Sequence, residues 1–315
     1  MARTKGKAVA KKMVGLSSGR KQDIFFSYAM LSPLIIGFLA FTIYPIIWAL
    51  CLAWFHYDSI PSHTYFSGLE NFITAFTVDM DYWHALGNTF LFAVCKLPIE
   101  IPLALFLAVL LNSNLKGRGF FRAAFYLPNI ISMAIIGLIF YNMFAYFGVI
   151  NSILDGLFPA MEPIDWFSTK PTAFTVIVAA SIWQTFGINM LYFLAALQNI
   201  PTECYESAKL DGAGRMRTFF SITLPLIAPT AQIILLLAIN GTLMTSDLIL
   251  VLTNGNPGGS TEVVMTYVLK RIAPGFADSG ANIGYGSALA VITSAILAMV
   301  ALIYMKASHR SSDIY

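Results

Sequence analysis

The residues most able to take part in chemistry or binding lie in a polar island between two long apolar runs. The island is Glu206-Ser207-Ala208-Lys209-Leu210-Asp211-Gly212-Ala213, and the next apolar run begins near Leu224-Pro225. Small residues at positions 208, 212 and 213 allow another protein to approach closely. We therefore expect a contact surface here. An ordinary helix at the membrane surface, with no partner, is the alternative that periodicity leaves open.

Polar side chains inside the apolar runs form a second group of candidates. Polar and ionisable residues within membrane spans are costly and often mark a transport pathway. Hydrogen bonding between helices is the alternative for each one, and for Asp247 we favour such bracing near the outer end of its span. The candidates are Tyr141, Asn142, Trp183, Gln184, Asn189, Asn240, Thr242, Thr245, Ser246 and Asp247.

Lys96 and Glu100 are four residues apart, so they can share one face of a helix. Each charge is expensive alone in lipid and less expensive when paired. We expect a structural ion pair that faces protein rather than a proton relay.

No motif in the sequence indicates a catalytic or metal site. The phosphate-binding pattern G-x-x-x-x-G-K-[ST] is absent, as are H-E-x-x-H and G-x-S-x-G. The four His and three Cys residues have no ligand spacing. This chain therefore shows no energy source of its own.

The composition predicts an all-α integral membrane protein. Hydrophobic residues make up 57% of the 315 residues and charged residues only 11%, against about 25% charged residues in soluble domains. Lipid cannot satisfy open backbone groups, so each span should be helical. Six stretches are long enough to cross a membrane: 28–55, 88–111, 124–146, 172–198, 225–252 and 283–305. They form one domain, 28–305, between a basic tail, 1–27, and a short C-terminal tail, 306–315.

The placement of basic residues predicts the orientation. All but four of the 19 Lys and Arg residues fall in the two tails and in the loops 112–123 and 199–222. Cytoplasmic loops carry the excess of Lys and Arg, so both termini and the polar island should be cytoplasmic. The basic tail fits this orienting role or contact with membrane lipid, and we expect no nucleic-acid partner.

Two short helices are predicted around the polar island, within 201–224. Pro201 suits a first helical turn, and Glu203 and Glu206 lie where a helix favours acids. Asp211-Gly212 should end this helix, because glycine readily takes a positive φ. The second helix should run from about residue 214 into the fifth span.

The island resembles the EAA loop of bacterial ABC-importer permeases, which has the pattern E-A-A-x-x-D-G-A followed by I-x-L-P. Glu206, Ala208 and Asp211-Gly212-Ala213 match it, as do Ile222, Leu224 and Pro225, and Ser207 replaces one alanine. The resemblance implies that this segment is a coupling helix, between spans 4 and 5, which inserts into a cleft of a cytoplasmic ATPase subunit. The island residues would then be the ATPase-coupling residues.

Other segments resemble the sugar branch of that family, the maltose- and glycerol-phosphate-type permeases. They are Gly68-Leu69-Glu70-Asn71-Phe72, the turn from Leu111 to Pro128, and Asp247 with Thr253, Gly255 and Pro257, where Ser246 and Asn256 depart from the pattern. The resemblance covers about 28–305.

The resemblance implies a six-span type I importer permease in the bacterial cell membrane. It would work with a second permease, expected to be a different chain, two cytoplasmic ATPase subunits and an extracytoplasmic solute-binding protein. The substrate would be a carbohydrate, and its pathway would lie between the two permeases. This chain would have no cofactor and no enzymatic site, since ATP and Mg would bind to the partner ATPase.

A self-sufficient ion-coupled transporter or channel is the rival interpretation. It would need paired titratable groups at the middle of the membrane, and only Lys96, Glu100 and Asp247 qualify.

Overall fold

The computed structural model describes residues 23–58, 60–113, 115–159, 162–273 and 281–312. Six helical segments in these ranges are long and apolar enough to cross a membrane, which confirms the predicted number. They are Asp23–Leu52, Met80–Asn112, Met133–Leu157, Lys170–Gln198, Arg215–Leu252 and Ile283–Ser308. The basic positions from Arg3 to Lys21, on which part of the orientation depends, lie outside the described residues.

Two long helices, α4 (Met80–Asn112) and α8 (Lys170–Gln198), form the centre of the bundle. In the most apolar window of the α8 span 61% of the residues are buried, against 28% or fewer in every other span. Helices α5 (Arg118–Ile130) and α11 (Leu224–Leu243) pack on this pair, and α14 (Ile283–Ser312) packs in turn on α11. Gly187 lets α5 approach α8 closely, because a Cβ there would collide with the backbone carbonyl of Phe125.

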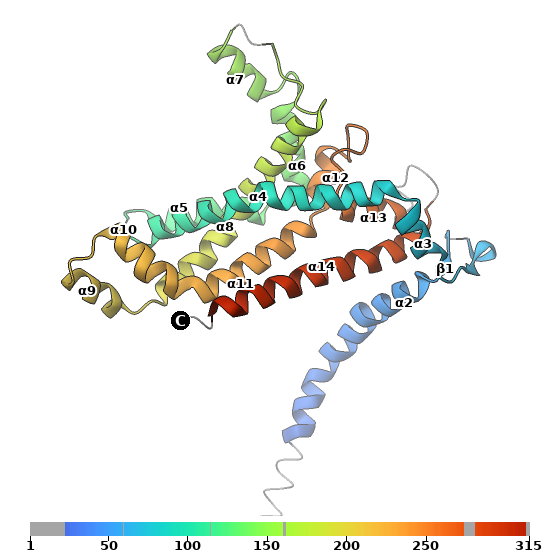
Figure 1. Cartoon of the computed structure of the whole chain (residues 1–315), viewed down its shortest axis with the longest axis horizontal. Helices are drawn as coiled ribbons and strands as arrows, with labels where there is room; N and C mark the ends of the chain where they lie inside the picture. The colour runs from blue at the N-terminus through green and yellow to red at the C-terminus, as the bar shows by residue number, and fades with distance from the viewer. Residues whose placement is uncertain (1–22, 59, 114, 160–161, 274–280, 313–315) are drawn as a thin grey trace, which may run out of the picture.

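The first span stands apart from this bundle over most of its length and contacts α14 near its C-terminal end (Figure 1). It ends in a π-helical turn, η1 (Leu39–Ile43), and in α2 (Tyr44–Leu52), and none of its most apolar window is buried. The predicted end at residue 55 was wrong, because Phe55–His56 is a short strand, β1, that pairs antiparallel with β2 (Tyr65–Phe66). A 3-10 turn, η2 (Pro61–His63), joins the two strands, and α3 (Glu70–Thr77) follows them.

The third predicted span, 124–146, is not one helix. Helix α5 ends at Ile130, the chain is extended at Ile131 and Ser132, and α6 (Met133–Phe144) begins a new direction toward α7 (Val149–Leu157). Pro128, two residues before the end of α5, lacks a backbone donor, and its ring disfavours a continuous helix. Helix α5 lies along α8, whereas α6 packs against α12 (Asp247–Leu252).

The fifth span is also broken. Helix α11 ends at Leu243, and α12 begins at Asp247 after a turn over 244–246. The chain then leads through α13 (Val264–Ile272) to α14. Asp247 therefore starts a short helix instead of lying within a long one, which corrects the predicted continuous span over 225–252.

A buried cluster of polar groups joins α4, α8 and α11. Lys96 Nζ lies 3.4 Å from Glu100 Oε2 and donates to Thr242 Oγ1 at 3.2 Å, while Asn189 Nδ2 donates to Glu100 Oε1 at 2.7 Å. The two charged side chains are 4% and 1% exposed. The predicted ion pair is therefore present and faces protein. Thr242 and Asn189, which the sequence presents as pathway candidates, are hydrogen-bond partners of this pair.

We expect replacement of Lys96 alone to destabilise the bundle strongly. Lys96→Met leaves the Glu100 carboxylate buried without its cation, and breaking a buried pair on one side costs about 3–5 kcal/mol. Replacing both charges, in Lys96→Met with Glu100→Gln, should recover much of the loss. Thermal unfolding of the purified chain in detergent measures the stability of the single and the double variant, with the exposed-site variant Lys209→Met as control. Equal destabilisation by the single and double variants would contradict this role of the pair.

Candidate functional site

The predicted 201–224 segment folds as two short helices at the end of the bundle farthest from β1 and α3 (Figure 1). Helix α9 (Thr202–Leu210) begins after Pro201 and ends at Asp211. Gly212 turns the chain with a φ of 71°, and Ala213 N donates to Ala208 O at 2.9 Å. Helix α10 (Arg215–Thr218) then continues through a π-helical turn, η3 (Phe219–Thr223), into α11. The glycine turn agrees with the sequence prediction, whereas Pro201 lies just before the first turn of α9 and not within it.

Most of this segment faces outward. Of the polar-island residues, Ala208 is buried and Ala213 half-buried, whereas Glu206, Ser207, Asp211 and Gly212 are exposed. Large apolar side chains are exposed beside these polar groups: Leu210 (89%), Met216 (70%) and Phe220 (58%). Exposed apolar surface of this kind marks contact with lipid or with another protein.

One side-chain contact links α9 to the start of the fifth span. Tyr205 Oη lies 3.2 Å from Thr223 Oγ1 in η3. Beside it, a groove of about 370 Å³ lies between the end of α4 and this segment, with Ser113, Arg215 and Thr218 among its lining residues. The segment is thus connected to α11 both through the chain and through this hydrogen bond.

The structure divides most of the predicted pathway residues into two groups. Four are buried inside the chain, namely Gln184, Asn189, Thr242 and Thr245, and five are exposed, namely Tyr141, Asn142, Trp183, Asn240 and Asp247, while Ser246 is half-buried. The Oε1 atom of Gln184 is buried without a hydrogen-bond partner in the described part of the chain. The ten residues do not converge on one site within this chain.

The exposed group lies on α6, α8, α11 and α12. Tyr141 stacks on Phe167 with ring centroids 5.2 Å apart, and Asn142 donates to the backbone oxygen of Leu138 at 2.7 Å. Asp247 Oδ1 accepts a hydrogen bond from Ser246 Oγ at 2.8 Å, and no described Lys or Arg forms an ion pair with it. These polar groups are therefore open to contacts from outside the chain.

At the opposite end, sequence reasoning missed a polar network centred on Asp79. Its Oδ1 accepts from Tyr82 N at 3.1 Å and from the Tyr267 hydroxyl at 2.7 Å, and its Oδ2 accepts from the Tyr285 hydroxyl at 2.5 Å. Arg271 Nη2 donates to Tyr267 Oη at 2.7 Å. Burial and the hydrogen bond to Asp79 raise the pKa of Tyr267 to about 12, so its phenol stays protonated and can donate.

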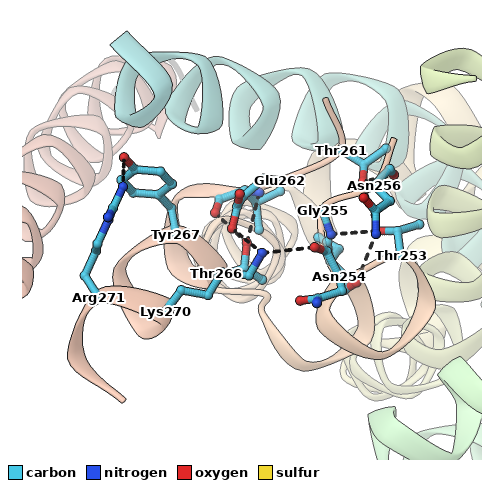
Figure 2. A network of polar contacts seen from close by, with 12 residues as sticks. Thr253, Asn254, Gly255, Asn256, Thr261, Glu262, Thr266, Tyr267, Lys270 and Arg271 are labelled. Atoms are coloured by element: carbon cyan, nitrogen blue, oxygen red, sulfur yellow. Dashed lines mark hydrogen bonds and ion pairs between the residues drawn. The ribbon is translucent and has the colours of Figure 1, made fainter. Parts of the chain in front are cut away.

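The turn after α12 is folded by its own polar contacts, as Figure 2 shows. Thr261 Oγ1 donates to Asn256 O at 2.7 Å and lies 2.9 Å from Thr253 Oγ1, and Lys270 Nζ contacts both Asn254 O and Glu262 Oε1 at 2.9 Å. Together with the Asp79 network, this turn ties α4, α13 and α14 together.

The comparisons with known proteins agree with this architecture. Residues 100–312 match the model of the family described as "Binding-protein-dependent transport system inner membrane component". A probable ABC transporter permease protein of Bacillus subtilis, YesP, is 36% identical over 91% of this chain and 92% of its own length. The arabinooligosaccharides permease AraP of the same organism is 33% identical, with 91% of each chain covered. The trehalose/maltose permease MalF of Thermococcus litoralis is 33% identical over 91% of this chain and 94% of its own length.

A solved structure shows the same fold. The crystal structure of a bacterial ABC transporter that imports the acidic polysaccharide alginate contains a chain with a TM-score of 0.80 and 26% identity, and the match covers 94% of this chain and 98% of that one. Six membrane spans, the family match and this fold agree. The chain therefore belongs to the family of binding-protein-dependent transport system inner membrane components, and it is a multi-pass permease subunit of an ABC importer.

Proposed function

We propose that this permease imports a carbohydrate and that the 201–224 segment couples it to ATP hydrolysis on a separate subunit. Relatives at 33% identity are named for arabinooligosaccharides and for trehalose/maltose, and the structural neighbour imports alginate. Different sugars share the same chemistry, hydroxyl groups on a ring with one apolar face. This shared chemistry supports a carbohydrate, without selecting one.

The exposed α9 is the observation on which the coupling role rests. Its outward residues Glu206, Ser207, Asp211 and Gly212 form, with Leu210, a knob that no other part of the described chain covers. In this proposal the knob docks into a cleft of one of two ATPase subunits, which hold ATP and Mg. Closure of those subunits would move α9, and Tyr205 and η3 would pass the movement to α11. The free energy of docking must differ between the open and closed states of the ATPase subunits, because otherwise docking cannot shift the permease from one state to the other.

The proposed orientation places this knob in the cytoplasm. The basic residues Lys116, Arg118, Lys209, Arg215 and Arg217 belong to the segments at the end of the bundle that includes α9 and the start of α5 (Figure 1). An excess of positive charge favours the cytoplasmic side. The Asp79 network and the turn after α12 would then face the extracytoplasmic solute-binding protein. The alginate importer was solved in complex with a periplasmic protein bound to alginate pentasaccharide, which supports such a partner.

The exposed pathway candidates support a sugar pathway that is shared with a second permease. Tyr141, Trp183, Asn240 and Asp247 are not covered by this chain's own helices. They combine aromatic faces with hydrogen-bonding groups, which is what a sugar requires. Lys96 and Glu100, by contrast, are sealed in protein, so the ion-coupled alternative lacks a titratable pair that reaches water.

Gly212→Val should uncouple ATP hydrolysis from transport. Glycine tolerates the positive φ at this turn, whereas a β-branched residue is strained there, and no atom within 4 Å would otherwise obstruct a Cβ. Gly212→Asn should retain coupling better, since Asn tolerates this conformation. Sugar uptake and ATPase activity of the assembled complex in vesicles measure the effect.

Gly214→Ala is the matched control, because Gly214 has a φ of −71° and open space around it. Its uptake should remain close to that of the unmodified chain. Normal uptake by a correctly inserted Gly212→Val protein would contradict the coupling role. If Gly212→Val and Gly212→Asn lose the same amount of uptake, then position 212 requires glycine because the partner approaches closely there, and not because of backbone strain.

For Asp247 we propose bracing against the second permease, because in the described part of the chain its only side-chain hydrogen-bond partner is the neighbouring Ser246. Asp247→Asn preserves the shape and removes the charge. It should reduce assembly with the second permease and leave the sugar preference of the surviving complexes unchanged. Competition between sugars for uptake, on complexes matched for assembly, is the measurement. A clear change in preference would instead place Asp247 in the sugar pathway.

A further inference from the structure

An apolar groove runs along the outer half of α4 and α8. It has a volume of about 700 Å³. Helix α4 lines it with Leu91, Cys95 and Ile99, which are four residues apart and so share one face. Helix α8 contributes Phe174, Val178 and Ala179. Leu91, Cys95, Ile99 and Ala179 are exposed, so the described chain does not cover the groove.

A separate polar pocket of about 340 Å³ lies at the outer end of the same two helices. Asp81, His84 and Asn88 line it from α4, and Glu262 lines it from the turn before α13. Lys170, the first residue of α8, lines both this pocket and the apolar groove. The two cavities therefore adjoin at Lys170.

Lys170 is held in place at this junction. Its Nζ donates to Asn88 Oδ1 at 2.7 Å and lies 5.6 Å from the centroid of the Phe174 ring. Asn88 is buried and donates in turn to the backbone oxygens of Ser260 at 3.0 Å and Glu262 at 2.8 Å. The ammonium group is thus fixed at the level where α8 begins.

The dimensions and charges fit a membrane lipid. From Lys170 to the last groove residue, Ile182, helix α8 rises about 18 Å. One leaflet is about 15 Å deep, half of a hydrocarbon core of about 30 Å. The polar pocket at the end of the groove contains one positive group, Lys170, and one exposed negative group, Asp81. Its other carboxylate, Glu262, already forms an ion pair with Lys270 at 2.9 Å.

We propose that the groove and pocket bind one outer-leaflet glycerophospholipid with a primary amine headgroup. An acyl chain occupies the apolar groove, the phosphate lies near Lys170 and the headgroup ammonium lies near Asp81. A lipid of the phosphatidylethanolamine type satisfies both charges, while a purely anionic headgroup leaves Asp81 unmatched. The proposed orientation determines only which leaflet supplies the lipid.

Filling the groove tests the proposal. The full chain, in its membrane complex, is reconstituted in vesicles of phosphatidylethanolamine and phosphatidylglycerol that contain a photoreactive phosphatidylethanolamine with a diazirine on its acyl chain. Label should appear on α4 and α8 around Cys95 and Ala179. Ala179→Trp should lose most of that label. Ala295→Trp, at an exposed small residue of α14 that lines neither cavity, should retain it.

A second comparison tests the headgroup. The unmodified chain should be labelled more by the phosphatidylethanolamine probe than by an equal amount of a phosphatidylcholine probe, whose trimethylated amine cannot donate. Asp81→Asn should remove this preference without abolishing labelling.

Two results would overturn the proposal. One is unchanged labelling of α4 and α8 in Ala179→Trp. The other is efficient crosslinking of Cys95 to a second permease by a short thiol-reactive reagent, with no lipid label, which would make the groove an interface between permeases. Neither result depends on transport, so failure here leaves the coupling proposal standing.

Discussion

The buried ion pair between Lys96 and Glu100 is the contact on which the rest of the bundle depends. A charge inside the membrane must be paired and hydrogen-bonded. Asn189 of α8 and Thr242 of α11 provide the additional hydrogen bonds, so one cluster fixes three helices. Helix α11 is also the continuation of α10 and η3, which follow the exposed α9. A displacement of the 201–224 segment therefore acts on a helix that is clamped to the centre of the molecule.

The two ends of the bundle are built differently. At the end near α3, Asp79 accepts hydrogen bonds from Tyr82, Tyr267 and Tyr285, and the turn after α12 is closed by its own side chains. At the other end, α9 projects from the bundle and is bridged to η3 by Tyr205. A braced end opposite an exposed knob suits the proposed function, in which movement enters the permease through the knob.

Sequence reasoning predicted the features that arise locally. Long apolar runs give spans, and the order of residues around Gly212 gives two helices with a turn at positive φ. It failed where a proline or a polar turn interrupts an apolar run, so the breaks at 131–132 and 244–246 were missed. It also could not find the Asp79 network, whose tyrosines lie 188 and 206 residues away in the chain. The pathway candidates did not converge, which is expected if the site is completed by a second chain.

Crosslinking at Glu206 tests the coupling claim most directly. Native Cys51, Cys95 and Cys204 are first replaced by serine, and Glu206→Cys is then compared with Glu70→Cys, an exposed position on α3 at the opposite end of the bundle. The account predicts that Glu206→Cys crosslinks to the ATPase subunit of the assembled importer with a yield that changes on nucleotide binding, whereas Glu70→Cys does not. Crosslinking of Glu70→Cys to the ATPase in place of Glu206→Cys would contradict both the coupling role and the orientation.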